Sequence, residues 1–402
     1  MTLVTNGRLI TRDPEGRGYY EHGAVAYEGT KIVEVGEEAA LKAKYPKAEI
    51  IDAKGGVIMP AFINAHTHIY SALARGLSIV GNNPTNFYEV LNGTWWAIDR
   101  RLTMEGTRAS ATALYRDSIT QGVTTIFDHH ASYGEIPGTL HTIAEESKRL
   151  GLRSCLCYEV SDRDGEEKCL QAIAENADFI TEYQQRKDPM LAAMFGGHAL
   201  FTISDKTFDR MVEANNGRTG YHIHVSEGMN DVYDSLQNYG RRPVQRLQDH
   251  GILGPKTILG HCIHVNTAEM EIIKETGTMV VNNPESNMGN AIGICPVLQL
   301  YKRGILLGMG TDAYTNDMLE SLKVALCSQR SQNCLPNVGW CEVTDMLFKN
   351  NTKIGAKYFP DELGVLKTGA AADIIVMDYK PFTPFSDENI DGHMIFGMTG
   401  RQ

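Results

Sequence analysis

The sequence predicts an α/β protein, namely a (β/α)8 TIM-like barrel with a small accessory β-sandwich domain formed by both termini. From Val57 onward, eight short apolar runs alternate with helix-length amphipathic segments, and such alternation implies parallel pairing of the strands. Histidine or aspartate follows several of these runs, and barrels carry their active sites at the C-terminal ends of the strands. Eight such units therefore favour a closed barrel over an open sheet.

The predicted barrel strands are, in chain order, VIMPAFINA, VTTIFD, RSCLCYEV, MLAAMFGG, GYHIHV, KTILGHC, TMVVNN and GILLGMGTD. Apolar residues at helical spacing mark the segments between them, such as AEMEIIKETG and EGTRASATALYRDSITQG, which ends at the helix-stop residue Gly122. We assign residues 57–360 to the catalytic barrel. Both flanks consist of short strand-like runs with turns, so residues 1–56 and 361–402 are assigned to the accessory β-domain.

Composition limits the classes of partner. The chain has 402 residues, 42% of them hydrophobic, and a formal net charge of -11, which argues against nucleic acid or an anionic membrane, because those ligands select basic surfaces. No signal peptide and no apolar run of membrane-spanning length is evident. The 8 cysteines are scattered without paired spacing, as in a reduced cytoplasmic protein. We expect a cytoplasmic enzyme with a small-molecule substrate and leave a homo-oligomer open.

The most informative residues are His66 and His68, at the end of the first barrel strand. Side chains at i and i+2 of a strand point to the same face, so two imidazoles are presented together, as ligands of one metal ion require. The later strand ends HIHVSE, LGHCIH and GMGTD supply His224, His261 and Asp312. Together these side chains predict a metal site at the barrel mouth.

Three imidazoles and a carboxylate suit one divalent metal ion, zinc or ferrous iron, with a position left for water. Such an ion lowers the pKa of water from about 15.7 toward about 7. Asp312 would then both coordinate the ion and accept the water proton. Glu227, one turn beyond His224, is free to pass a proton to a leaving group. These separate roles of Asp312 and Glu227 suit hydrolysis at an electron-poor carbon that bears nitrogen.

The motifs NAHTH, HVSE, GHCIH, NNPESN and GTD, in this order, resemble the amidohydrolase superfamily. They are most similar to its single-metal deaminase and chlorohydrolase branch, and within it to the SsnA-type aminohydrolases. The resemblance implies that the metal ligands are His66, His68, His224 and Asp312. It also makes Glu227 the proton shuttle, and it makes His261 the imidazole that hydrogen-bonds the attacking water or the tetrahedral centre.

The resemblance spans nearly the whole chain and implies a substrate contact for His198, in GGHALFTISD. Many relatives have proline where Leu200 stands here, so the local loop is expected to differ. Relatives also commonly continue past the position of Gln402, so a final strand of the β-domain is expected beyond it.

Other aromatic and histidine side chains are weaker candidates. His130, which follows His129 at the end of the second strand, is open between substrate contact and a structural role. The insertion from Ile69 to Arg101 is expected to overhang the site, and there Trp95 and Trp96 are open between stacking on a ring-shaped substrate and core packing.

Three further residues and one segment are expected to support the site. His222 lies deeper on the strand of His224 and is interpreted as a packed core histidine. His264 is expected to orient His261, three residues earlier. Asp128 is a candidate for holding the tautomer of a neighbouring histidine, and NNPESN is expected to fix a loop.

The leading hypothesis is an aminohydrolase that deaminates an amino-substituted heterocycle or an amidine-like substrate. Chlorohydrolase and cyclic-amide hydrolase activities remain alternatives on the same scaffold. Two-metal cyclic-amide hydrolysis needs a bridging lysine at the fourth strand end, and Lys206 lies too far along the chain. The small zinc deaminase fold is disfavoured because its H-x-E and P-C-x-x-C motifs are missing. A non-catalytic binding protein should have lost a ligand or the acid, and all are present.

Overall fold

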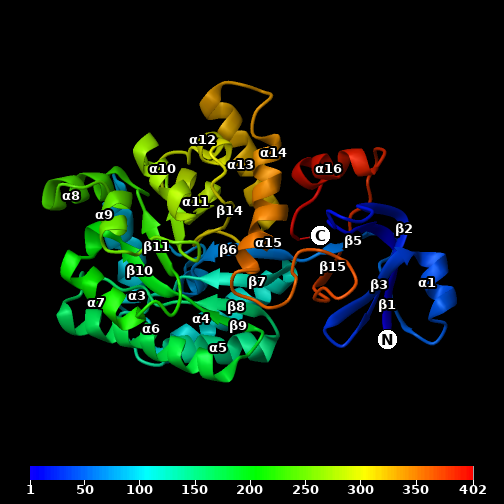
Figure 1. Cartoon of the computed structure of the whole chain (residues 1–402), viewed down its shortest axis with the longest axis horizontal. Helices are drawn as coiled ribbons and strands as arrows, with labels where there is room; N and C mark the ends of the chain where they lie inside the picture. Colours follow the sequence, from blue (N-terminus) through cyan, green and yellow to red (C-terminus); the bar gives the residue numbers. More distant parts are fainter. Residues whose placement is uncertain (402) are drawn as a thin grey trace.

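The computed structural model describes residues 1–401, and its largest part is a barrel of parallel strands inside a layer of helices (Figure 1). The barrel strands are β6 (Phe62–Thr67), β7 (Val123–Asp128), β8 (Arg153–Leu156), β9 (Leu191–Ala193), β10 (Phe195–Ala199), β11 (Tyr221–Val225), β12 (Ile258–His261), β13 (Met279–Asn282) and β14 (Leu307–Met309). Only Met194 separates β9 from β10, so these two strands form one unit of the eight. Hydrogen bonds order the strands as β6-β7-β8-β9 and β10-β11-β12-β13-β14.

The two strand groups join at both edges and close the barrel. Thr67 of β6 forms a parallel bridge with Asp312 beyond β14, and Val160 forms one with Gly197 of β10. The N–H of Asp312 also donates to the carbonyl of His66 at 3.0 Å. The predicted (β/α)8 barrel is confirmed.

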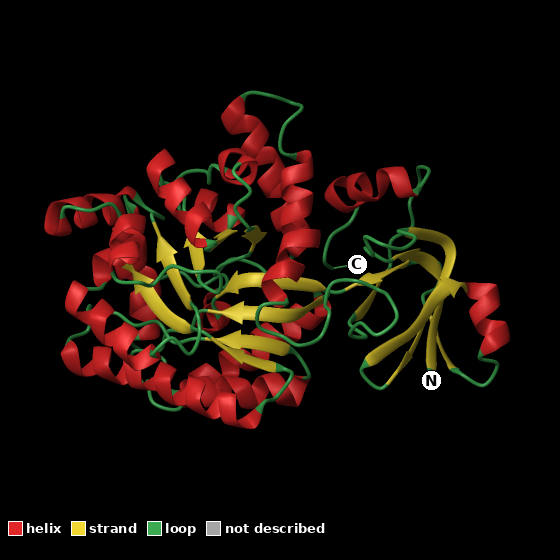
Figure 2. Ribbon diagram, viewed as in Figure 1, coloured by secondary structure: helices red, strands yellow, loops and turns green. Residues whose placement is uncertain are grey.

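Helices cover the outside of the barrel, as Figure 2 shows in red. They are α4 (Met104–Thr120), α5 (Thr139–Leu150), α6 (Glu166–Arg186), α7 (Asp205–Asn215), α8 (Met229–Tyr239), α9 (Pro243–Asp249), α10 (Thr267–Thr276), α11 (Pro284–Gly289), α12 (Val297–Lys302), α13 (Met318–Asn333), α14 (Trp340–Asp345) and α15 (Asn351–Gly355), with the short η3 (Leu200–Thr202) and η4 (Met346–Asn350). Local sequence sets their ends. Asn266 and Glu269 form a reciprocal capping box at the start of α10, and Gly277 ends that helix at a φ of 66°.

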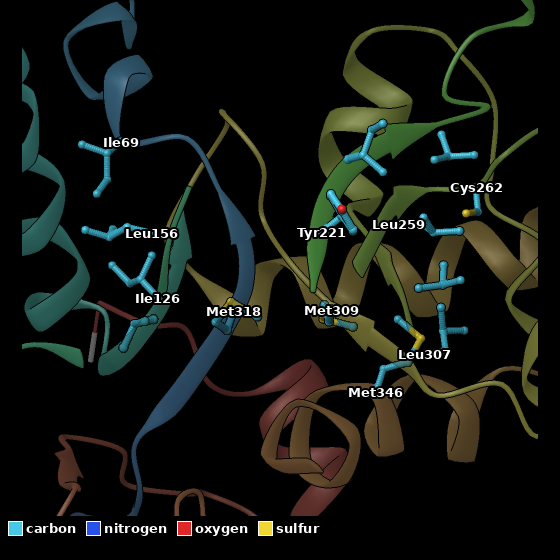
Figure 3. Close-up of a cluster of buried hydrophobic side chains, with 14 of the residues drawn as sticks. Ile69, Ile126, Leu156, Tyr221, Leu259, Cys262, Leu307, Met309, Met318 and Met346 are labelled. Carbon is cyan, nitrogen blue, oxygen red and sulfur yellow. The ribbon is translucent and has the colours of Figure 1, made fainter. Parts of the chain in front are cut away.

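Apolar side chains fill the space between the strands and the surrounding helices. Figure 3 shows Ile126, Leu156, Leu259 and Leu307 in this layer, and each is fully buried. Burial of such surface contributes about 25 cal/mol per Å², so this layer stabilises the barrel beneath its mouth. Among residues 1–401, no helix has both the length and the apolar character needed to cross a membrane.

The two termini build one mixed sheet beside the barrel (Figure 1). Its strands are β1 (Thr2–Ile10), β2 (Tyr19–Glu28), β3 (Lys31–Glu37), β4 (Glu49–Asp52), β5 (Val57–Pro60) and β15 (Ile374–Met377). Helix α1 (Glu38–Lys44) packs Leu41 against Leu3 and Ala24 on one face. The described residues place all six strands in a single sheet, so the predicted β-sandwich is not confirmed. Strand β5, predicted to begin the barrel, pairs instead with β1 and β15.

Two further segments complete the fold. The insertion after β6 holds η1 (Ile69–Ala74), α2 (Phe87–Val90), η2 (Leu91–Trp95) and α3 (Trp96–Asp99). The C-terminal segment holds η5 (Asp387–Asn389) and α16 (Ile390–Phe396), which contacts α13. The strand expected after Gln402 lies outside the described residues.

Candidate metal centre and active-site pocket

The strand ends bring the predicted ligand residues together at the mouth of the barrel. The ligand atoms of His66, His68 and His224 lie within 4.8 Å of one another, and so do those of His66, His261 and Asp312. All of these side chains are buried. The i and i+2 positions on β6 therefore meet β11 and the segment after β14, as the strand geometry predicts.

Backbone carbonyls orient two of the imidazoles. The Nδ1–H of His68 donates to the carbonyl of His129 at 2.6 Å, and the Nδ1–H of His224 donates to the carbonyl of His198 at 2.7 Å. This leaves the two Nε2 atoms facing each other at 3.2 Å. In neutral imidazoles with the proton on Nδ1 these two atoms carry lone pairs, which repel at this distance unless a proton or a metal ion lies between them. Nitrogens bound at about 2.0 to 2.1 Å to a tetrahedral zinc lie about 3.3 Å apart, so the spacing fits a shared metal ion.

The third imidazole is held by another histidine. His66 is fully buried, and its Nδ1 lies 2.8 Å from the Nε2 of His222. Its own Nε2 has no hydrogen-bond partner among the described residues. Buried polar atoms are nearly always paired, so this nitrogen also fits a metal ligand. His222 lies behind the centre, in contact with a ligand residue and not only in the apolar core.

The carboxylate of Asp312 completes the centre. Its Oδ1 lies 3.0 Å from the Nε2 of His68 and 3.9 Å from that of His66. Burial opposes ionisation, but the hydrogen bond and charge of His68 outweigh it and hold the pKa of Asp312 well below its usual range. Asp312 in turn raises the pKa of His68 to about 9 against the effect of burial. Asp312 and His68 therefore stabilise each other's charged forms, and the donor set of the cluster fits one divalent metal ion.

The backbone is strained where the strands deliver these side chains. Ser226, His261 and Asp312 have φ values of 49°, 69° and 57°, in the left-handed region that non-glycine residues rarely adopt. Such conformations cost about 1 to 3 kcal/mol each and cluster at functional sites. Gly310 relieves crowding beside Asp312, because a Cβ there would lie 2.7 Å from the carbonyl oxygen of His66.

His261 and Glu227 lie beside the centre. The Nδ1–H of His261 donates to the Oδ1 of Asn287 at 2.7 Å, so its Nε2 faces the site, 3.6 Å from Glu227 and 3.7 Å from Asp312. Burial, and after it the charges of Asp312 and Asp231, raise the pKa of Glu227 well above its ordinary value. Glu227 thus lies next to an oriented imidazole, where burial favours its protonated form.

These groups open into a pocket of about 440 Å³. Its lining residues are His68, Tyr70, Phe87, Leu91, Trp95, Trp96, Glu159, His198, His224, Glu227, Ser286, Asn290, Asp312 and Ala313. Of the predicted substrate contacts, Trp95 and His198 line this pocket. His130 is fully buried outside the lining, with no hydrogen-bond partner at either ring nitrogen among the described residues. Burial lowers the pKa of His130 to about 3.

Two supporting roles differ from the prediction. His264 does not orient His261, because its Nε2–H donates to the carbonyl of Ile292 at 2.8 Å. Asn287 of the NNPESN segment orients His261 instead. Asp128 accepts a hydrogen bond from the N–H of Ile69 at 2.7 Å and makes none with a histidine ring.

The sequence reasoning also missed Glu159, which lines the pocket. A signal was available, because Glu159 falls in the strand-like run RSCLCYEV near the same barrel edge as the histidines.

Fold and site together define a (β/α)8 barrel with a metal-binding cluster at its mouth. Residues 57–400 match the amidohydrolase family, and residues 23–48 match an imidazolonepropionase-like composite domain of bacteria. The chain belongs to the amidohydrolase family. It is 30% identical over 406 aligned residues to a 5'-deoxyadenosine deaminase of Methanosarcina mazei, covering 99% of this chain and 89% of that protein.

A second relative is a 5-methylthioadenosine/S-adenosylhomocysteine deaminase of Thermococcus sibiricus, 31% identical over 93% of this chain and 85% of that protein. Among solved structures, a zinc-bound adenosine deaminase of Xanthomonas campestris gives a TM-score of 0.87 at 22% identity, covering 100% of this chain and 90% of that one. An atrazine chlorohydrolase of Arthrobacter aurescens in complex with zinc gives a TM-score of 0.81 at 22% identity, covering 100% of this chain and 92% of that one.

Proposed function

We propose that this chain is a zinc-dependent aminohydrolase that hydrolyses the C–N bond of an amino-substituted heterocycle and releases ammonia. The observation that carries the proposal is the placement of Glu227 and His261 beside the three-histidine, one-aspartate cluster. His66, His68, His224 and Asp312 would hold the ion. The mixed nitrogen and oxygen donor set suits zinc and also ferrous iron, and the zinc-bound structural relatives favour zinc.

When bound, a divalent ion of this kind supplies activated water at neutral pH, because it lowers the pKa of water from about 15.7 toward about 7. Asn287 keeps the proton of His261 on Nδ1, so the Nε2 lone pair accepts a hydrogen bond from the attacking water. Asp312 takes up the proton that the water loses. Glu227, held protonated by burial, donates to the departing nitrogen, which cannot leave as an amide ion.

The substrate is proposed to be a small aminated ring of the purine nucleoside type. Two relatives are named as deaminases of 5'-deoxyadenosine and of 5-methylthioadenosine or S-adenosylhomocysteine. His198 and Trp95 lie in the pocket lining, where an imidazole can hydrogen-bond a ring nitrogen and an indole can stack on the ring. His130 has two ring nitrogens without a hydrogen-bond partner among the described residues. We propose that it affects substrate binding through a neighbouring residue and does not contact the substrate.

The alternatives are less well supported. A chloride leaving group needs no proton, so the placement of Glu227 favours deamination over the activity of the chlorohydrolase relative. Cyclic-amide hydrolysis would need a lysine between two metals, and Lys206 is exposed on α7, 3.5 Å from Glu166. We also propose that the barrel, beginning after β5, is the catalytic domain and the terminal sheet an accessory domain.

The test measures ammonia release by the zinc-loaded chain from a panel of aminated purines, pyrimidines, pterins and triazines, with matched chloro compounds. Deamination with higher kcat/KM than dechlorination is expected. His66→Ala should lose stoichiometric zinc and all turnover while keeping most of the fold. Full zinc occupancy in that variant, measured by elemental analysis, would contradict the ligand assignment. Consistently faster release of chloride would contradict the deaminase assignment.

A further inference from the structure

Glu159 is a carboxylate in the pocket wall that the proposed mechanism does not use. It lies just beyond β8, where bridges of Tyr158 to His130 and of Val160 to Gly197 hold the chain in the barrel wall. Its exposed fraction is 2%, and it lines the pocket. A nearly buried carboxylate facing a pocket needs a partner.

The contacts that Glu159 makes within the protein are long. Its oxygens lie 3.5 Å from the Nδ1 of His129, 3.5 Å from an Nη of Arg163 and 3.8 Å from the Nε2 of His198, at or beyond the limit of a hydrogen bond. Burial opposes ionisation, but His198, His129 and Arg163 together hold the pKa of Glu159 below its usual range. The carboxylate of Glu159 thus lies among basic groups, and its contacts with them are all 3.5 Å or longer.

The nearby arginines form their closest ion pairs with other carboxylates. Arg163 contacts Asp99 most closely, and the Nε of Arg100 lies 2.7 Å from Asp164. Burial raises the pKa of Asp99 to about 7 even though both of its oxygens face the guanidinium of Arg163. Arg100 and Arg163 thus make their closest ion pairs with Asp164 and Asp99, and Arg163 lies 3.5 Å from Glu159.

The rest of the pocket suits a cation. Tyr70, Phe87, Trp95 and Trp96 line it, and aromatic faces attract positive charge. Within residues 1–401, no lysine or arginine contributes to its lining. A carboxylate among aromatic rings stabilises ammonium, amidinium or guanidinium groups.

We propose that Glu159 is a specificity-determining residue that binds a cationic group of the substrate, remote from the amino group that is hydrolysed. The inference rests on the proposed aminohydrolase function and narrows its substrates to those that carry a second, positively charged nitrogen. Glu159 takes no part in proton transfer and acts through substrate binding.

The test compares 5'-amino-5'-deoxyadenosine, which carries an ammonium group, with 5'-deoxyadenosine, which carries a methyl group at the same carbon. Binding to the zinc-loaded full chain is measured by calorimetry, and kcat/KM by ammonia release. A hydrogen bond between charged groups stabilises binding more than a methyl contact does, so the wild type should bind the ammonium compound about tenfold or more tightly. Glu159→Gln should remove this preference while the affinity for 5'-deoxyadenosine stays within about threefold. Glu166→Gln, on the exposed surface of α6, is the matched control and should keep the preference.

Equal affinity of the wild type for the two compounds, including no binding of either, overturns the proposal, as does a preference that survives in Glu159→Gln. If Glu159→Gln loses affinity equally for both compounds and has a lower melting temperature, Glu159 acts only as a structural partner of Arg163, and this result also overturns the proposal. If calorimetry shows the preference but no compound of the panel is deaminated, the aminohydrolase function fails and the cation site stands. Deamination without a charge preference overturns the cation site alone.

Discussion

The clearest prediction concerns His222, the residue behind the metal centre. His222→Leu removes the acceptor 2.8 Å from the Nδ1 of His66 and leaves a donor without a partner in a fully buried site. An unsatisfied buried donor costs about 1 to 3 kcal/mol, and loss of such a supporting hydrogen bond weakens metal affinity by about 10 to 100-fold. The zinc dissociation constant should therefore rise by about 10 to 100-fold, equivalent to about 1.4 to 2.8 kcal/mol.

The measurement is competition for zinc against a fluorescent chelator, with circular dichroism to show that the variants are folded. His222→Gln places an amide oxygen where it can accept from His66, and it should recover part of the affinity. His264→Gln is the control, because His264 contacts the carbonyl of Ile292 and no ligand residue, and it should bind zinc like the wild type. A folded His222→Leu variant with unchanged zinc affinity would refute the argument.

Three further predictions test neighbouring parts of the molecule. Glu227→Gln should keep zinc by elemental analysis but lower kcat by about 10² to 10⁴-fold, and loss of zinc would make Glu227 a ligand. Asn287→Leu removes the acceptor of the His261 Nδ1–H, so kcat should fall by about tenfold or more at unchanged zinc content, and an unchanged kcat would exclude the orienting role. On α5, hydrogen bonds from Arg149, and then from Thr112 and Arg108, lower the pKa of Glu146 from 4.5 to about 2. Its stabilising contribution is therefore complete above about pH 4.5 and is lost as the pH falls toward 2, so Glu146→Gln should lower the melting temperature at pH 7 and differ progressively less from the wild type in acid. A constant difference across that range would contradict this assignment.

Much of the barrel could be predicted because its signals are local. Apolar runs and helical spacing depend on neighbours within a few residues, and the stop at Gly122 ends α4 at a φ of 75°. The terminal sheet was harder to predict from the sequence. Strand β5 is as apolar as a barrel strand, and only its pairing with β1 and with β15, more than 300 residues away, assigns it to that sheet.

The chemical groups that meet in the site could be predicted from the sequence, because His66 and His68 share a strand face and parallel strands end at one barrel mouth. The orientation of those groups could not be predicted in this way. The three-dimensional packing was needed to show that His222 and not His264 contacts His66, that His130 is buried away from the pocket, and that Glu159 lines it. The physical reason is that a hydrogen bond depends on distances of a few tenths of an ångström between residues far apart in the chain. No local pattern of residues encodes those distances.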